Sequence, residues 1–248
     1  MTKQGLLLFD IDGVIRDVTN SYRLAIQETV KIFCNWKPTI KDIDNLKAEG
    51  NWNNDWDASL ELIKRRASIE KNLHSIPSLE EVIKIFNELY FGGDPDGDSS
   101  QWKGFIQNEP LLVSKTFFDE LTSQGILWGF VSGAETSSAK FVLEKRLQLR
   151  SAPLIAMGDA PEKPNPSGLL LLARQIINKS LGTGIPPIGY LGDTVADVLT
   201  IKEARQKVPL QKFISMAIAP PHLHNKSQIS FRNKYESKLK NAGADFII

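Results

Sequence analysis

The chain has 248 residues, 42% of them hydrophobic and 24% charged, which is ordinary usage for a globular protein and excludes a disordered or fibrous class. Its 30 Lys and Arg residues almost balance 29 Asp and Glu residues, so it lacks the basic excess typical of proteins that coat nucleic acid. A single cysteine, Cys34, excludes an internal disulfide, and no apolar run approaches the roughly 20 residues that a membrane span requires. We therefore expect a cytoplasmic protein with neither a nucleic-acid nor a membrane partner.

The first predicted strand is the apolar run Gly5–Phe9, which Asp10 ends. The segment after it has helical spacing and few β-rich runs. Its expected features are a helix face marked by Tyr22, Ile26, Val30 and Phe33, helices at Asp55–Ala67 and Leu79–Phe91, a capping box at 78–81 and a turn-rich linker at Gly92–Asp98. We therefore predict a helical cap with its linkers at residues 17–106, inserted into a catalytic core of residues 1–16 and 107–248.

The rest of the chain alternates short apolar runs with segments of helical spacing. Further strands are expected at Ile126–Val131, Pro153–Met157, Ile188–Leu191, Phe213–Ala219 and Asp245–Ile248. Helices are expected at Ser114–Ser123, Ala134–Leu149, Pro166–Asn178 and Thr194–Gln206. The apolar runs are continuous, as in strands that are covered on both faces of a parallel sheet. This order predicts an α/β fold with a doubly wound, mainly parallel sheet.

Two acidic residues follow the first predicted strand directly. Asp10 and Asp12 flank one residue, and Gly13 lets the chain turn away. Ligands of open α/β sheets bind outside the carboxyl ends of the strands, so these side chains face the expected crevice. Two such carboxylates can serve one Mg²⁺ ion. One carboxylate can also attack phosphorus to form an aspartyl phosphate, while the other moves a proton.

Two later loops offer groups that bind an anion. Ser132 and Gly133 follow the second core strand and are expected to open a helix with a hydroxyl group and backbone N–H groups. Lys163 lies in the loop Glu162–Pro166, where two prolines restrict the backbone and Asn165 is a good helix start. A phosphate site with several carboxylates needs such a cation to limit repulsion. Taken alone, each loop favours a structural role, because serine is a common helix cap and a lysine in a turn usually lies at the surface.

A second pair of acids, Asp193 and Asp197, lies across the end of a later strand and the start of a helix. Because they are four residues apart, we expect them on one face of that helix, near its positive end. They could complete a cation site. Acidic residues are also common at helix N-termini for capping alone.

In this order and in these structural contexts, the four motifs make the chain resemble the haloacid dehalogenase superfamily. Within the superfamily, the chain resembles the phosphoglycolate-phosphatase-like branch (subfamily IA), whose cap is inserted after the first motif. The resemblance covers nearly the whole chain, from Gly5 to Ile248. It implies a Rossmann-like core and a Mg²⁺-dependent phosphatase that hydrolyses a small phosphorylated metabolite through an aspartyl phosphate.

The resemblance also implies a role for each acidic residue. Asp10 would be the nucleophile and a metal ligand. Asp12 would be the general acid and base, with its backbone carbonyl also on the metal. Asp193 would be the second carboxylate ligand of the metal, and Asp197 would bind it through water or brace the other ligands.

For the remaining motifs, the resemblance implies that Ser132 binds the phosphoryl group together with the amide of Gly133, and that Lys163 steadies both Asp10 and the phosphate. Two positions depart from the usual pattern of this branch. Gly133 replaces an amide side chain, and Ser167 replaces an acid. Both departures weaken any transfer of substrate identity.

Several alternatives stay open at this point. A phosphosugar mutase uses the same acids, whereas a 2-haloacid dehalogenase needs neither the metal nor usually the second aspartate. A non-catalytic binding protein would be expected to have lost some of these residues. Candidate substrates are sugar phosphates, phosphoglycolate, amino-alcohol phosphates and nucleotides. The oligomeric state is expected to be a monomer or a homodimer. In the cap, Asn54 and Asp55 lie between Trp52 and Trp56 and could contact the substrate.

Overall fold

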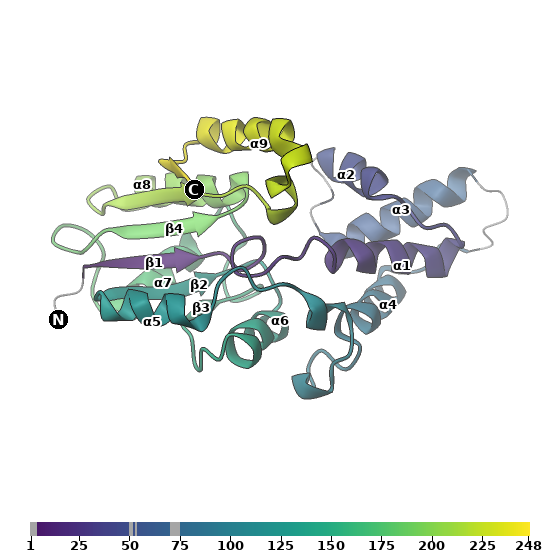
Figure 1. The fold of residues 1–248 in the computed structure, drawn as a ribbon, viewed down its shortest axis with the longest axis horizontal. Helices are drawn as coiled ribbons and strands as arrows, with labels where there is room; N and C mark the ends of the chain where they lie inside the picture. The colour runs from purple at the N-terminus through teal and green to yellow at the C-terminus, as the bar shows by residue number, and fades with distance from the viewer. Residues whose placement is uncertain (1–3, 50–51, 53, 70–74) are drawn as a thin grey trace. The chain divides into compact units, whose positions relative to one another are not determined.

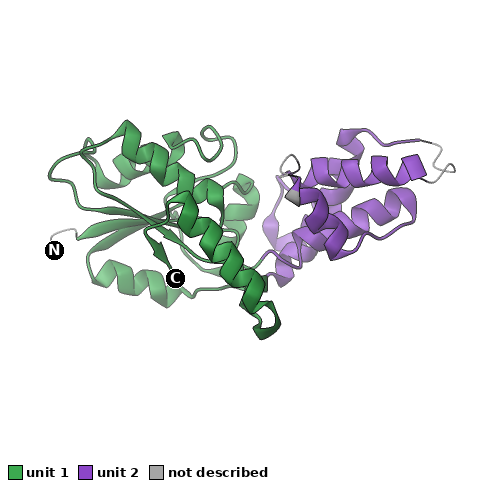
Figure 2. Ribbon diagram, turned by 90° about the horizontal axis from the view of Figure 1, so that it is seen from above, with its two compact units in different colours: residues 1–17, 110–248 green, residues 18–109 purple. Residues whose placement is uncertain are grey.

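The structure, a computed structural model, describes residues 4–49, 52, 54–69 and 75–248. It divides into two compact units, shown in Figure 2, which we call the sheet unit (residues 1–17 and 110–248) and the helical unit (18–109). The sequence predicts that the core resumes at residue 107, whereas residues 107–109 belong to the helical unit. The reason is that the Glu109 carboxylate accepts hydrogen bonds from two hydroxyl groups of the helical unit, Ser21 and Tyr90.

The sheet unit contains six parallel strands in the order β3-β2-β1-β4-β5-β6. The strands are β1 (Gly5–Phe9), β2 (Ile126–Val131), β3 (Leu154–Ile155), β4 (Ile188–Gly192), β5 (Phe213–Ala217) and β6 (Phe246–Ile247). Each of them lies within one residue of, or inside, an apolar run that the sequence predicts as a strand. The predicted fold class, a doubly wound parallel α/β sheet, is confirmed.

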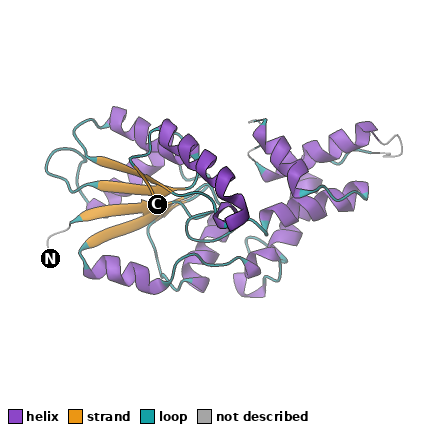
Figure 3. Cartoon of the chain, turned by 45° about the horizontal axis from the view of Figure 1, so that its top comes forward, coloured by secondary structure: helices purple, strands orange, loops and turns teal. Residues whose placement is uncertain are grey.

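Helices cover both faces of this sheet (Figures 1 and 3). They are α5 (Lys115–Ser123), α6 (Thr136–Lys140), α7 (Ser167–Ile177), α8 (Val195–Lys207) and α9 (Ile229–Ala242). The alternation of β1 shows how both faces are buried: Leu6 and Leu8 pack into a cluster with apolar residues of α7 and α8, while the Phe9 ring meets Phe118 of α5 at 5.8 Å. This two-sided burial explains why the strands read as continuous apolar runs.

Two elements differ from the prediction. Strand β3 is shorter than Pro153–Met157, because the backbone N–H of Ala156 donates to the Asp159 carboxylate and that of Met157 donates to the carbonyl of Ala134, so neither extends the sheet. The helix expected over Ala134–Leu149 begins at Thr136 and continues as a π-helical stretch, Phe141–Arg146.

The helical unit contains α1 (Tyr22–Cys34), α2 (Ile40–Ala48), α3 (Asp55–Ile69) and α4 (Leu79–Phe91), with short 3-10 turns at Ser99–Gln101 and Phe105–Asn108. The predicted capping box of α4 is present, with Ser78 and Glu81 bonded reciprocally. Helix α2, which the sequence analysis did not predict, begins with the same device at Thr39 and Asp42. Within the described ranges, no helix has both the length and the hydrophobicity needed to cross a membrane.

Candidate active site

The site lies where the adjacent parallel strands β1 and β4 end. Asp10 follows β1 directly, and its backbone N–H donates to the carbonyl of Leu191 at 2.8 Å. Asp193 follows Gly192, the last residue of β4. One carboxylate oxygen each of Asp10, Asp193 and Asp197 lies within 4.8 Å of the others. The topology therefore brings together two motifs that are more than 180 residues apart in the sequence.

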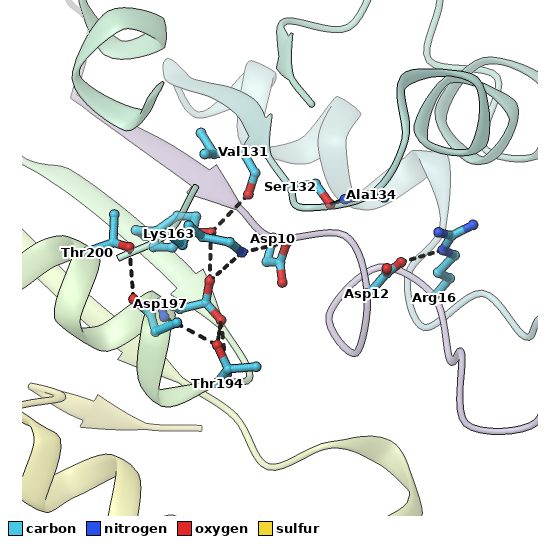
Figure 4. Close-up of polar contacts among 12 residues, drawn as sticks. Asp10, Asp12, Arg16, Val131, Ser132, Ala134, Lys163, Thr194, Asp197 and Thr200 are labelled. Atoms are coloured by element: carbon cyan, nitrogen blue, oxygen red, sulfur yellow. Dashed lines mark hydrogen bonds and ion pairs between the residues drawn. The ribbon is translucent and has the colours of Figure 1, made fainter. Parts of the chain in front are cut away.

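Lys163 supplies the positive charge of this cluster (Figure 4). Its Nζ atom lies 2.6 Å from Asp197 Oδ1 and 3.1 Å from Asp10 Oδ1. Its side chain is only 17% exposed, and those of Asp10 and Asp197 are 7% and 2% exposed. The predicted association of Lys163 with Asp10 is thus present, and the lysine is also bonded to Asp197.

The cluster holds more negative than positive charge, and the pKa values reflect this imbalance. Burial raises the pKa of Asp10 to about 7, opposed by the charge of Lys163 and reinforced by the charges of Asp197 and Asp12. Burial and the charge of Asp10 likewise raise the pKa of Asp193 well above its ordinary value. Burial acts to raise the pKa of Asp197 as well, but its ion pair with Lys163 and the hydrogen bonds from Lys163 and Thr194 keep it below the ordinary value.

Asp193 and Asp197 occupy different kinds of position, and the prediction that both lie on one helix face is wrong. Helix α8 begins at Val195, so Asp193 lies before it, in the turn after β4. Thr194 is the N-cap: its side chain accepts a hydrogen bond from the backbone of Asp197, while Asp197 Oδ2 accepts from the Thr194 backbone at 2.9 Å. The capping box thus fixes Asp197, and its other oxygen, Oδ1, faces Lys163.

Two glycines give the acidic side chains the space that they occupy. Gly13 has φ of +76°, and a Cβ atom there would lie 2.1 Å from Asp193 Oδ2. A Cβ atom on Gly192 would lie 2.3 Å from Cβ and Cγ of Asp197. Real Cβ atoms do not approach other atoms so closely, so both carboxylates pack directly against backbone that carries no side chain.

Asp12 lies outside this carboxylate cluster. Its carboxylate is directed toward Arg16, whose Nε donates to Asp12 Oδ1 at 2.6 Å (Figure 4). Arg16 is fully buried, while the Asp12 side chain is 28% exposed. The local backbone closes this turn, because the N–H of Gly13 donates to the carbonyl of Arg16 at 2.9 Å. An ion pair therefore holds the candidate acid and base in one orientation, and the sequence analysis did not identify its cationic member.

Ser132 follows β2 and is buried, and its Oγ accepts a hydrogen bond from the backbone N–H of Ala134 at 3.1 Å. The helix expected to open here starts later, at Thr136, so Ser132 and Gly133 belong to the turn before it. Gly133 is exposed, and nothing lies within 4 Å of the place where a Cβ atom would stand. The assigned role of both residues in phosphate binding stays a prediction.

The two cap residues singled out in the sequence have structural partners within the helical unit. Asn54 Oδ1 accepts hydrogen bonds from the backbone N–H groups of Trp56 and Asp57 at the start of α3, as an N-cap does. Asp55 Oδ1 lies 2.5 Å from Lys47 Nζ of α2. Asn53 of the same segment lies outside the described residues. The proposed contact of Asn54 and Asp55 with substrate stays a prediction.

Two tyrosines, neither of which was predicted from the sequence, belong to the site. Tyr190 of β4 is buried, and its hydroxyl group contacts both Lys163 and Asp197. Tyr235 of α9 donates to the backbone carbonyl of Asp193 at 3.0 Å. In the sequence, Tyr190 is an aromatic residue in an apolar strand and resembles a core residue. The one available signal was its position three residues before Asp193.

The residues of the cluster fit a divalent cation. Asp10 Oδ1 is buried and makes no hydrogen bond within the described ranges, although Lys163 lies 3.1 Å away. Burying carboxylates in excess of cations is costly, and a divalent ion bound by their oxygens would remove that cost. Carboxylate oxygens are the ligands that Mg²⁺ prefers. Asp10, Asp193 and Asp197 could therefore hold a metal ion.

Comparison with known proteins identifies the family. The sequence profile of a haloacid dehalogenase-like hydrolase matches residues 5–205, so the chain belongs to the haloacid dehalogenase-like hydrolase family. The resemblance stated from the motifs is thereby confirmed.

Three solved structures share the fold over nearly the whole chain. They are phosphatase Tt82 from Thermococcus thioreducens (17% identity, 95% of this chain and 99% of that chain, TM-score 0.62), a predicted phosphoglycolate phosphatase from Haemophilus somnus (16%, 100% and 94%, 0.66) and a protein assigned as a beta-phosphoglucomutase from Thermotoga maritima (17%, 98% and 94%, 0.62). At these identities the likeness is one of fold.

Two curated proteins match by sequence. The imidazoleglycerol-phosphate dehydratase of Phytophthora nicotianae is 32% identical over 200 residues, which are 80% of this chain and 41% of that protein. An insoluble isoenzyme of beta-fructofuranosidase from Arabidopsis thaliana is 29% identical over 157 residues, or 55% and 27% of the two proteins. The chain therefore spans less than half the length of either relative.

Proposed function

We propose that the chain is a Mg²⁺-dependent phosphatase that hydrolyses a small phosphomonoester with Asp10 as nucleophile. The observation that carries this proposal is the cluster of three carboxylates at the ends of β1 and β4, of which the buried pair, Asp10 and Asp197, contacts Lys163. The excess negative charge of such a cluster suits a divalent cation. The cation and Lys163 together then suit the phosphate group of a substrate. Membership of a hydrolase family supports the same reaction class.

In the proposed first step, a carboxylate oxygen of Asp10 attacks phosphorus and forms an aspartyl phosphate, while the bond from phosphorus to the ester oxygen breaks. Asp12 gives its proton to the leaving oxygen. In the second step, Asp12 takes a proton from water, the water oxygen attacks phosphorus, and the bond to Asp10 breaks to release inorganic phosphate. The hydrogen bond from Arg16 Nε to Asp12 Oδ1 keeps the Asp12 side chain oriented through both transfers, and its other oxygen, Oδ2, carries the proton.

Other residues bind and position the phosphoryl group. Lys163 would pair with the phosphate oxygens while it remains fixed by Asp197, and Ser132 with the amide of Gly133 would bind a further oxygen. Mg²⁺, held by Asp10, Asp193, Asp197 and the backbone carbonyl of Asp12, would neutralise charge on the phosphoryl oxygens. Positioning and charge neutralisation supply most of the catalysis of phosphoryl transfer.

A phosphosugar mutase is the second candidate, because the same acids serve that reaction and one structure of the same fold is assigned as a beta-phosphoglucomutase. The two reactions differ in their product: a phosphatase releases inorganic phosphate, and a mutase returns the phosphoryl group to a sugar. A 2-haloacid dehalogenase is less well supported, because it would not need the carboxylates of Asp193 and Asp197. A non-catalytic binding protein would not need the set of Asp10, Asp12 and Lys163.

The test is phosphate release by the purified chain from a panel of phosphomonoesters. The panel contains sugar phosphates, phosphoglycolate, amino-alcohol phosphates and nucleotides, and an aryl phosphate for unspecific activity. It also contains imidazoleglycerol phosphate, because the name of one relative contains that compound. We expect release with Mg²⁺, none with EDTA, and recovery when Mg²⁺ is returned. Full turnover in rigorously metal-free buffer would overturn the metal dependence, and isomerisation of a sugar phosphate without phosphate release would favour the mutase.

A further inference from the structure

Tyr190 lies near the middle of β4, between aliphatic residues and glycines, and is 1% exposed. A tyrosine in a buried strand has to satisfy its hydroxyl group, because burying a hydroxyl group without a hydrogen bond costs free energy. The hydrogen-bond partners of Tyr190 are Lys163, Asp197 and the carbonyl group of Val131, which all belong to or adjoin the candidate active site. Phenylalanine would fill the same space without needing them, so the hydroxyl group calls for a reason beyond packing.

The hydroxyl group joins three separate parts of the site. It lies 2.9 Å from Asp197 Oδ1 on α8 and 2.9 Å from the carbonyl oxygen of Val131, the last residue of β2 and the neighbour of Ser132. It accepts a hydrogen bond from Lys163 Nζ at 3.2 Å. A phenol carries a single hydrogen, so only one of the two acceptors, Asp197 or Val131, receives it at a time.

The ammonium group of Lys163 carries three hydrogens, which rotate freely unless partners fix them. Asp197 Oδ1 accepts one at 2.6 Å, and Tyr190 accepts a second at 3.2 Å. With two hydrogens placed, the direction of the third is set. The remaining neighbour of the ammonium group is Asp10 Oδ1 at 3.1 Å, an oxygen that accepts no hydrogen bond among the described residues.

We propose that Tyr190 is a positioning residue that orients the Lys163 ammonium, so that its third N–H group is directed to Asp10 and to the phosphoryl group that Asp10 attacks. The proposal rests on the function proposed above. Lys163 makes the catalytic contact, and Tyr190 orients Lys163. It does so directly, through their hydrogen bond, and indirectly, through Asp197, to which both residues are bonded.

The experiment is a double-mutant cycle with Tyr190→Phe and Lys163→Met, measured as kcat/KM on the best ester of the panel. Tyr90→Phe is the matched control, since Tyr90 is equally buried and its hydroxyl group bonds to Glu109 at 3.0 Å in the helical unit. Hydrogen bonds to charged groups are the stronger kind, so we expect Tyr190→Phe to lower kcat/KM about tenfold to a hundredfold. In the Lys163→Met background, the same change should cost less than about threefold, because its target is gone.

A second readout does not depend on activity. The Lys163 ammonium gives an NMR signal in ¹⁵N-lysine-labelled protein when it is buried and held by hydrogen bonds, and Lys163→Met identifies that signal by its loss. We expect the signal to persist in Tyr90→Phe and to broaden or disappear in Tyr190→Phe. An unchanged signal in Tyr190→Phe, or losses in kcat/KM that simply multiply in the double variant, would overturn the proposal. If the wild-type chain releases no phosphate, the phosphatase proposal fails, and the NMR comparison still decides the role of Tyr190.

Discussion

Each of the two units buries a cluster of polar side chains, and the two clusters are built in opposite ways. In the helical unit, the single carboxylate of Glu109 accepts hydrogen bonds from the hydroxyl groups of Ser21 and Tyr90, at 2.5 and 3.0 Å. In the sheet unit, carboxylate oxygens of Asp10, Asp193 and Asp197 lie close together, and the ammonium group of Lys163 contacts two of them, Asp10 and Asp197. One buried oxygen of Asp10 accepts no hydrogen bond from any described residue.

The difference separates a cluster that serves the fold from one that serves a ligand. Neutral donors such as the hydroxyl groups of Ser21 and Tyr90 stabilise a buried carboxylate without adding charge. Three carboxylates around one cation repel one another, and folding alone does not compensate for that repulsion. A loss of folding stability of this kind is expected at functional sites, where the requirements of activity and stability conflict. Substitutions should therefore act in opposite directions in the two clusters, and the following predictions test this.

The largest expected effect is on turnover in the sheet unit. Asp10→Asn should lower kcat by at least about 10⁴-fold, because it removes the nucleophile. Asp119→Asn is the control, since Asp119 is an exposed acid on α5 that pairs with Lys115. Phosphate release and trapping of the phosphoenzyme measure the result. A phosphoenzyme that still forms in Asp10→Asn would show that another residue is the nucleophile.

Asp12→Asn should be slower by about 10²–10⁴-fold, because proton transfer to the leaving oxygen and from water is lost. The loss should be smaller for an aryl phosphate, whose leaving group departs without a proton, than for an alkyl phosphate. Rates on both esters measure the difference. The acid role of Asp12 is contradicted if both esters slow by the same factor while the affinity for Mg²⁺ is unchanged.

In the helical unit, Glu109→Ala should lower Tm and leave kcat on the aryl phosphate unchanged. The change removes the carboxylate that accepts hydrogen bonds from the buried hydroxyl groups of Ser21 and Tyr90, which should lower Tm by about 5–10 °C. Glu80→Ala, at an exposed position in the first turn of α4, controls for loss of an acid in the same unit. Thermal unfolding measures the effect. A Tm equal to that of Glu80→Ala would mean that the Glu109 cluster contributes nothing to stability.

The metal-free protein should become less stable as pH rises from about 4 to about 7, because the raised pKa of Asp10 lies at about 7. Between these values the folded protein holds a proton that the unfolded chain has released, so raising the pH favours unfolding. We expect a fall in Tm of roughly 3–8 °C over this window. Asp10→Asn should remove part of the fall and raise Tm at pH 8.

Mg²⁺ should counter the same effect, because it competes with protons for the carboxylates and raises Tm more at pH 8 than at pH 5. Differential scanning calorimetry with EDTA or with Mg²⁺ measures both trends. A metal-free Tm that is flat in wild type and Asp10→Asn alike would contradict the account of charge excess.

The smallest effects are expected for the cap residues. Asn54→Ala removes the cap of α3, at a cost of about 0.5–2 kcal/mol, and Asp55→Ala breaks the ion pair with Lys47. If these residues also contact substrate, they should change kcat/KM unequally across the ester panel and alter the aryl phosphate least. Kinetics and thermal unfolding of both variants measure this. Equal losses on every ester, with a matching fall in Tm, would limit both residues to holding the helices.

The strands were predictable because burial on both faces requires a continuous apolar run, and such a run between turn residues is easily recognised in the sequence. The ends of β3 were not, because its backbone turns to Asp159 and Ala134, contacts that no local pattern encodes. Helix α2 was missed because it buries few residues: Ile43 and Leu46 are the buried hydrophobic side chains among those described in it.

In the site, residues whose chemistry is unambiguous were found from the motifs, and residues that act through position were not. Asp10, Lys163 and Asp197 converge, as the order of the motifs suggested. The role of Tyr190 was not predicted, because its partners Val131 and Lys163 are 59 and 27 residues away in the chain. A buried tyrosine whose partners come from distant loops cannot be told from a core tyrosine until those loops are placed.

The close fit of Gly13 and Gly192 against the aspartates limits how the sequence can vary. A single methyl group at either position would occupy space that Asp193 or Asp197 now fills, although neither glycine carries a charge or a donor that the reaction uses. In a saturation-mutagenesis survey, these two positions should tolerate as few replacements as the aspartates themselves. The evolutionary freedom of the chain is therefore limited by room beside the backbone as well as by the chemistry of its acids.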